Sequence, residues 1–282
     1  MVSRMKQSVK LILLAVLFSA YRTTAQDDAA TDPDTDAEPT SILDTTNQQD
    51  TKRAGRMMGG ATVSIANYPY VATVEIQTGA RRVMYSHGTI VSNTQVLTTA
   101  STVEPSGYAG GIKSVQIRAG SNYQDMEGFI FAVSKCQIHL EYDINLITND
   151  LAVITITGSF SGYPNVQPIA IQTNEIPFSR TNPTNCLVVG WGSDSSNNPT
   201  NLLLSRVDYK LAADASCNNT FDTMQCAEPV SGSICYDNMG FPLVCNNRLY
   251  GVHPMIGVCQ TGPVQFAKLS AASMQAFQLH QW

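Results

Sequence analysis

Short runs of strand-forming residues dominate the chain from residue 57 onward. Residues 71–76 alternate apolar and polar side chains, as a strand with one buried face does. β-branched and aromatic residues are common in the other runs, which lie at 95–99, 115–118, 129–133, 151–156, 186–189, 205–211, 249–252 and 264–266. Turn-rich stretches such as 193–199 separate them. Many short strands at this spacing predict an all-β barrel or sandwich.

Helical periodicity is found at the carboxyl-terminal end of the chain. Leu269, Ala272, Ala276 and Leu279 recur at helical spacing, and Ser270 could cap the first turn. The pattern predicts a helix at 269–281.

The first 25 residues have the order of a secretory signal. Basic residues precede an apolar run at 11–18, and small residues follow as far as Ala25. The run is about half as long as a membrane span requires. The pattern predicts cleavage after Ala25 and a secreted, extracellular protein.

Residues 26–56 change character abruptly. They hold eight acidic and three basic residues and no aromatic ones, so we expect a disordered acidic leader that ends in exposed basic residues. The remaining domain, 57–282, keeps a small negative balance. This charge gives no reason to expect nucleic acid or an anionic membrane surface as a partner.

Seven cysteines in a secreted chain should mostly pair, and an odd number leaves one over. The chain has no Cys-x-x-Cys repeat and no His-x-x-x-His, so we expect neither a metal site nor a cofactor. Asn218 begins the sequon Asn-Asn-Thr, a candidate glycosylation site in a secreted chain.

Five separated blocks stand in a fixed order along the domain. They read M-M-G-G at 57–60, S-H-G-T-I-V at 86–91 with V-L-T-T-A-S-T at 96–102, N-D-L-A at 149–152, C-L-V-V-G-W-G at 186–192 and C-Y-D-N-M-G-F-P-L-V-C at 235–245. In this order they resemble blocks of the trypsin-like (chymotrypsin-fold) serine proteases. The resemblance implies two antiparallel Greek-key β-barrels, at about 57–165 and 166–268, followed by the carboxyl-terminal helix.

The resemblance also locates the catalytic positions. Asp150 stands at the aspartate of the family's triad, Ser101 at the histidine and Met239 at the nucleophile. A serine cannot relay a proton near neutral pH, and a thioether cannot attack a carbonyl as a hydroxyl does. We therefore predict an inactive homologue, in which Asp150 is a residual core group bonded to Ser101 or to backbone and Met239 fills the former site.

The supporting positions have changed as well. By resemblance, Asp237 occupies the position whose N–H would support the oxyanion, and Asn238 occupies the aspartate that pairs with a new amino terminus. Cleavage between Arg56 and Met57 would create that terminus, and we expect at most weak insertion of Met57.

The substrate pocket resembles the family's in position but not in residues. Ser233 stands at its floor, and Pro254, Met255 and Ile256 replace the edge that pairs with a substrate backbone. Proline and a branched side chain there disfavour peptide binding in the substrate manner.

The disulfide pattern implied by the resemblance is Cys186–Cys245, Cys217–Cys226 and Cys235–Cys259. The resemblance also implies a bridge beside the catalytic histidine, but this chain has Ser86 and Thr102 at its two cysteine positions. Cys136 remains, either as a buried free thiol or as an intermolecular bridge.

We predict a secreted serine protease homologue that acts by binding secreted proteins such as active proteases or inhibitors, as a regulator, cofactor or decoy. Reproductive (seminal) or gut fluid is the setting we favour. Other readings remain: a haemolymph immune-cascade cofactor, a hydrolase with an unconventional site, and a structural secreted component.

Overall fold

The computed structural model describes residues 60–78, 81–104, 114–192, 203–218, 221–234, 239–254 and 262–269, together with Met274 and Phe277. The chain divides into two compact units, Met1–Asp50 and Thr51–Trp282, and every described residue belongs to the second. Within the described ranges, no helix is both long enough and apolar enough to cross a membrane.

Several predicted features lie outside these residues. They are the signal at 1–25, the leader at 26–56, the Arg56–Met57 cleavage site, and most of the 269–281 helix. Of that helix, Leu269, Met274 and Phe277 are described, and all three side chains are buried.

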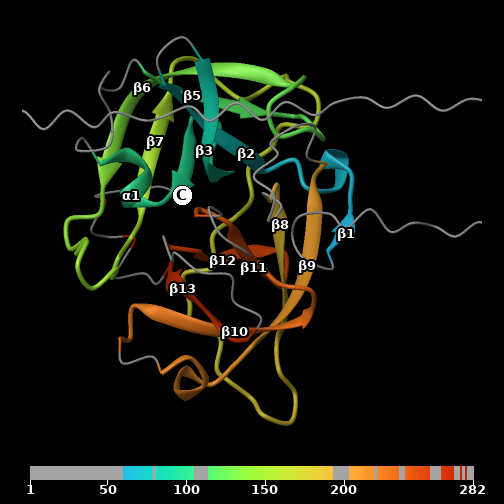
Figure 1. The fold of residues 1–282 in the computed structure, drawn as a ribbon, viewed down its shortest axis with the longest axis vertical. Helices are drawn as coiled ribbons and strands as arrows, with labels where there is room; N and C mark the ends of the chain where they lie inside the picture. Colours follow the sequence, from blue (N-terminus) through green and yellow to red (C-terminus); the bar gives the residue numbers. More distant parts are fainter. Residues whose placement is uncertain are drawn as a thin grey trace, which may run out of the picture. The chain divides into compact units, whose positions relative to one another are not determined.

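The first barrel is a closed ring of six antiparallel strands in the order β2-β3-β4-β7-β6-β5. Figure 1 shows it in teal to yellow-green. Its strands are β2 (Val71–Thr78), β3 (Arg81–Ile90), β4 (Gln95–Thr98), β5 (Val115–Ala119), β6 (Phe129–Ile138) and β7 (Ala152–Ile156).

The second barrel is a ring in the order β8-β9-β10-β13-β12-β11, which the β11–β8 pairing closes, and it appears in gold to red in Figure 1. Its strands are β8 (Asn185–Gly190), β9 (Ser205–Leu211), β10 (Met224–Ser231), β11 (Pro242–Cys245), β12 (Arg248–Val252) and β13 (Val264–Lys268). A two-residue strand, β1 (Ala61–Thr62), pairs with β9. The predicted fold of two antiparallel barrels is therefore confirmed.

The helices among the described residues are short. α1 (Ala100–Val103) follows β4, and the 3₁₀ turns η1 (Ile65–Asn67) and η4 (Asp214–Cys217) lie before β2 and after β9. In β9 buried residues alternate strictly with partly exposed ones, because successive side chains of a strand point to opposite faces.

The buried apolar residues form three clusters. One fills the first barrel around Ile117 and Ile154, and another fills the second around Tyr209 and Phe266. The third combines residues of both barrels, with Val71 and Leu151 from the first and Trp191 and Leu249 from the second. Burial of this shared cluster fixes the interface at which the candidate site lies.

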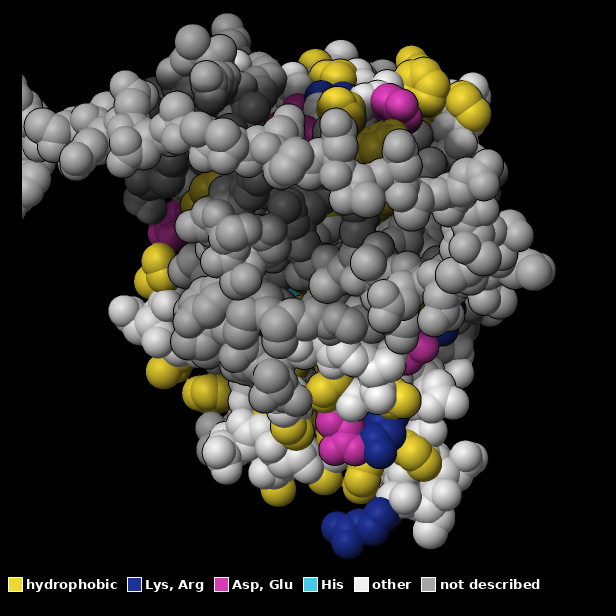
Figure 2. Space-filling view, turned by 45° about the vertical axis from the view of Figure 1, so that its right-hand side comes forward, with side chains coloured by type: hydrophobic (Ala, Val, Ile, Leu, Met, Phe, Trp, Pro, Cys, Tyr) yellow, Lys and Arg dark blue, Asp and Glu magenta, His cyan; other side chains and the backbone are white. Residues whose placement is uncertain are grey.

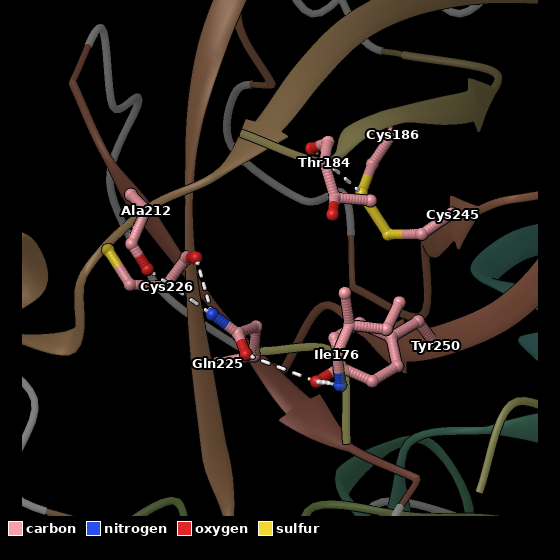
Figure 3. Close-up of a disulfide and its surroundings, with 8 residues drawn as sticks. All are labelled: Ile176, Thr184, Cys186, Ala212, Gln225, Cys226, Cys245 and Tyr250. Carbon is pink, nitrogen blue, oxygen red and sulfur yellow. Dashed lines mark hydrogen bonds between the residues drawn. A yellow bond between two sulfur atoms is a disulfide. The ribbon is translucent and has the colours of Figure 1, made fainter. Parts of the chain in front are cut away.

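Two of the three expected disulfides are present. Cys186 pairs with Cys245 across β8 and β11, and Cys217 pairs with Cys226. Figure 3 shows the first of these bridges, with the buried amide of Gln225 bonded to Tyr250 and to backbone oxygens nearby. The expected Cys235–Cys259 pair lies outside the described residues.

Cys136 is a free cysteine on β6. It is half-buried and packs against the core cluster of the first barrel, and burial raises the pKa of its thiol to about 11. The free thiol and the intermolecular bridge that the sequence left open both stay predictions.

Candidate functional site: a serine–aspartate pair and a locked loop

The buried carboxylate of Asp150 is bonded by Ser101. Asp150 lies just before β7 and is fully buried, and Ser101 lies in α1, directly after β4. The backbone N–H of Ser101 donates to Oδ1 at 2.8 Å, and its hydroxyl donates to Oδ2 at 2.9 Å. The sequence left open a bond to Ser101 or to backbone, and Asp150 accepts one of each kind, from the hydroxyl and from the backbone N–H of Ser101.

The neighbouring backbone explains how Asp150 is held in place. Asn149 has a left-handed φ of 50°, a conformation that asparagine adopts more readily than most residues, and its side chain donates to the carbonyl of Glu141. β4 and β7 pair in register from Gln95–Thr155 to Thr98–Ala152, which brings α1 beside Asp150. Each carboxylate oxygen of Asp150 thus accepts a charge-assisted hydrogen bond from Ser101.

The backbone carbonyl of Met239 is bonded to residues of β3. Its carbonyl oxygen accepts from the backbone N–H of His87 at 3.0 Å, and Nδ1 of the same residue lies 3.2 Å away. The Ser86 hydroxyl lies 3.1 Å from that oxygen, in position to donate. Residues of β3 in the first barrel therefore hold the loop that precedes β11 of the second.

His87 is enclosed by aromatic rings. Its imidazole stacks on Phe241 with centroids 3.7 Å apart and lies nearly parallel to Trp191 at 6.1 Å. The backbone N–H of Trp191 donates to Nε2 at 2.9 Å, so Nδ1 carries the proton and donates to the carbonyl oxygen of Met239. Burial lowers the pKa of His87 to about 3, which excludes it as a general base or acid near neutral pH.

Two glycines make room for this contact. A Cβ on Gly190 would lie 2.3 Å from Phe241 Cε1 and 2.5 Å from His87 Cδ2. Gly240 has a φ of +81°, and a Cβ there would lie 2.2 Å from the carbonyl oxygen of His87. Larger residues at either position would separate the loop from β3.

Ser86 and Thr102 stand at the two positions where the resemblance implies a disulfide in the family. The Ser86 hydroxyl lies 3.2 Å from Thr98 Oγ1, which donates to the His87 carbonyl at 2.7 Å. Thr102 bonds with Thr99 at 2.5 Å instead of with Ser86. The hydroxyl groups of Ser86 and Thr102 therefore bond to separate partners, Thr98 and Thr99.

The pocket positions are described in part. Ser233 is buried beside Ile234, whose N–H donates to the Tyr209 hydroxyl at 3.3 Å. Pro254 is buried, and His253 before it exchanges backbone bonds with Gly240 and Phe241. The oxyanion, activation and pocket-edge positions Asp237, Asn238, Met255 and Ile256 lie outside the described residues.

The remaining titratable groups form no metal centre in the described part of the chain. No group of three or more His, Cys, Asp or Glu residues there could hold an ion.

His139 accepts the backbone N–H of Glu141 at 3.1 Å and packs edge-on against Phe277. On the face shown in Figure 2, the described acidic and basic side chains are few and form no continuous basic patch.

Sequence reasoning missed the role of His87. Its place in the S-H-G-T block, where the related motif has glycine, was a signal of an unusual contact. The partners of its ring, Trp191 and Phe241, lie more than a hundred residues further along the chain.

Comparison with known proteins finds similarity to trypsins. The family model described as Trypsin matches residues 57–274. The chain is 28% identical to Trypsin alpha of Drosophila erecta over 207 residues, which is 70% of this chain and 76% of that protein. It is 28% identical to Trypsin alpha-4 of Lucilia cuprina over 206 residues, with the same shares covered. Trypsin delta of Drosophila erecta is 29% identical over 210 residues, 70% of this chain and 77% of that protein.

Proposed function

The chain belongs to the trypsin family of serine proteases, and from this premise we propose that it is a secreted member without peptidase activity that acts by binding other secreted proteins. The observation that carries the proposal is the pair of bonds from Ser101 to Asp150, at 2.8 and 2.9 Å. Ser101, which has no imidazole, bonds both oxygens of the carboxylate that would orient the histidine of an active site.

The chemistry of acyl transfer supports the proposal. The reaction needs a hydroxyl or thiol nucleophile and a base that takes its proton. Met239 offers a thioether at the nucleophile position, and His87 is turned toward Trp191 with its pKa lowered to about 3. Loss of one triad member already lowers turnover on the order of a millionfold. Two of the three are replaced here.

The setting is proposed on separate grounds. The two disulfides fit an oxidising compartment, and the pattern of residues 1–25 is that of a secretory signal. A binding role would be that of a regulator, cofactor or decoy in an extracellular protease network. Asn218 is exposed directly after η4, as a glycan acceptor must be, and begins a sequon.

The test of inactivity compares the purified chain with a repaired variant. The wild-type protein, cut after Arg56, is incubated with a broad peptide library and with a fluorophosphonate that labels activated serines. We expect no turnover and no label. The matched variant carries Ser101→His and Met239→Ser, and labelling of its new serine would show that the assay detects a restored site. Turnover by the wild type that is lost in Asp150→Ala would overturn the proposal.

A further inference from the structure

The 139–149 loop connects β6 to β7 and ends directly before Asp150. In Figure 1 it is the lime-green loop that projects beyond the sheet at the left. It carries three large apolar side chains on its surface: Leu140 is 77% exposed, Ile144 49% and Leu146 56%. Single exposed apolar residues are common on soluble proteins, but three on one short loop mark a candidate contact surface.

The tip of this loop is ordered by its own polar groups. Oδ1 of Asp143 accepts the N–H of Asn145 at 2.8 Å and that of Leu146 at 3.1 Å. The N–H of Asp143 donates to the carbonyl of Thr148 at 3.1 Å, which closes an isolated bridge. The backbone that carries the apolar side chains is thus held in place, which lowers the entropy lost when a partner binds.

The base of the loop is anchored as firmly. The N–H of His139 donates to the carbonyl of Leu151 at 2.9 Å, and Nδ2 of Asn149 donates to the carbonyl of Glu141 at 3.1 Å. Ile147 has a φ of 55°, a left-handed conformation that is strained for a β-branched residue. Such strain persists where the surrounding bonds over-determine the backbone, and it concentrates at functional segments.

The charge around the apolar side chains is negative. The 139–149 loop contains Glu141 and Asp143 and no lysine or arginine. Tyr142 lies between them in sequence, and its pKa is raised to about 12 by burial and by the charges of Asp150, Glu104 and Asp143. Glu104 directly after α1, Asp143 in the loop and Asp150 shortly before β7 therefore act on the same side chain. A complementary partner must bring positive charge.

We propose that the 139–149 loop is the docking element of this protein, and that its partner is a folded secreted protein with an apolar pocket rimmed by lysine or arginine. The inference rests on the binding function proposed above and assigns it a surface. Leu140, Ile144 and Leu146 fill the pocket, and Glu141 and Asp143 face the basic rim. A second copy of the chain would set the same acidic loops against each other, which disfavours self-association through this surface.

The test uses the full chain and, as its probe, the extracellular fluid in which the protein occurs. Immobilised wild-type protein is compared with the triple variant Leu140→Ser, Ile144→Ser, Leu146→Ser and with the charge variant Glu141→Gln, Asp143→Asn. Asparagine keeps the oxygen that bonds the N–H groups of Asn145 and Leu146. The matched control is Leu203→Ser with Val230→Ser, which removes apolar side chains that are 44% and 60% exposed elsewhere.

We expect the captured protein to bind the triple variant at least tenfold more weakly, as removal of interface anchors does, and to bind the control variant as it binds the wild type. The charge variant should bind more weakly too, and raising the salt concentration should weaken the wild-type complex. A carbodiimide should join Glu141 to a lysine of the partner. Thermal unfolding of each variant checks that the fold is intact, and single serine variants replace the triple variant if it unfolds.

The outcomes separate this inference from the binding function. A partner that binds the wild type and the loop variants equally, or that cross-links elsewhere, overturns the loop assignment and leaves the binding role in place. Capture of a second copy alone overturns the assigned partner chemistry. If no protein is retained by the wild type, the binding function fails and the loop assignment fails with it.

Discussion

The imidazole of His87, from the first barrel, lies flat against the ring of Phe241, from the second, with centroids 3.7 Å apart and planes inclined by 21°. The same imidazole bonds Met239 and Trp191 through its two nitrogens. One side chain therefore connects β3, the loop before β11 and the end of β8. The loop that would carry a nucleophile is held by a contact that serves structure.

Replacing His87 with alanine should destabilise the protein by about 3 kcal/mol. The change removes a buried stacked ring and leaves the backbone N–H of Trp191 without an acceptor in a dry site. Urea unfolding followed by tryptophan fluorescence measures the difference. The control is Val230→Ala at a side chain that is 60% exposed, where we expect a change within about 0.5 kcal/mol. Equal stability of the His87 variant and the wild type would contradict the structural role.

His87 also gives the stability a defined dependence on pH. Its pKa is about 6.5 in an unfolded chain and about 3 in the folded protein, lowered by burial first and also by the charge of His253. The unfolded state therefore binds more protons between these values, so the stabilising contribution is complete above about pH 6.5 and is lost as the pH falls toward 3.

The measurement is the free energy of unfolding from pH 7 to pH 4 for the wild type and for His87→Gln. His87 should contribute a slope of at most about 1.4 kcal/mol per pH unit, and the glutamine variant should lack it. The difference between the two slopes isolates this group from carboxylates that titrate in the same range. Parallel curves would show that His87 is accessible to protons in the folded state.

Strands could be predicted from the sequence where their own residues show a strand pattern. The strict alternation of 205–211 appears as β9, and the apolar run at 151–156 contains β7. β3 was not predicted, because Arg81–Ile90 contains arginine, serine, histidine and glycine, which have weak strand preference. It forms because it pairs along the whole length of β2, from Val71–Thr89 to Thr78–Arg81.

The candidate site was predicted to a similar extent. The bond between Ser101 and Asp150 was expected because the resemblance placed both residues in one triad. The enclosure of His87 could not be foreseen, since its partners belong to another barrel and depend on space left by Gly190 and Gly240. Contacts of this kind arise from the packing of two domains and leave no periodic signal in the sequence.

The two described disulfides should contribute differently to the free energy of unfolding. Cys186 and Cys245 are 59 residues apart, whereas Cys217 and Cys226 are 9 apart. Loop-closure entropy predicts losses of about 4 kcal/mol for the long loop and about 2.5 kcal/mol for the short one when both cysteines of a pair are replaced by alanine. Denaturant unfolding of the two double variants checks the order. A larger loss for the short loop would show that native packing outweighs chain entropy.

Cys136 should react slowly in the native protein. Its thiol is half-buried and its pKa is raised to about 11, so the thiolate fraction at pH 7.5 is small. Iodoacetamide should modify it much faster after denaturation in guanidinium chloride, as intact-mass measurements under the two conditions will show. A non-reducing gel of the native protein should show a monomer. A dimer that is converted to monomer by reductant would restore the intermolecular bridge.

The Ser101–Asp150 pair should behave as a coupled structural unit. In Ser101→Ala the backbone N–H bond to Oδ1 remains and the hydroxyl bond to Oδ2 is lost, so the buried carboxylate keeps part of its compensation. Losing a hydrogen bond to a buried charged group costs about 1.5–3 kcal/mol. In Asp150→Ala the charge itself is removed, and the serine hydroxyl loses its acceptor.

A double-mutant cycle separates these effects from the cavities that the substitutions leave. The single variants and the double variant Ser101→Ala, Asp150→Ala are unfolded in urea at pH 7, and their free energies are combined to give the pairwise coupling. We expect about 1.5–3 kcal/mol, the range for a hydrogen bond to a charged group. A coupling near zero would mean that Asp150 is held by its other contacts, and that the Ser101 hydroxyl adds nothing to the stability of the fold.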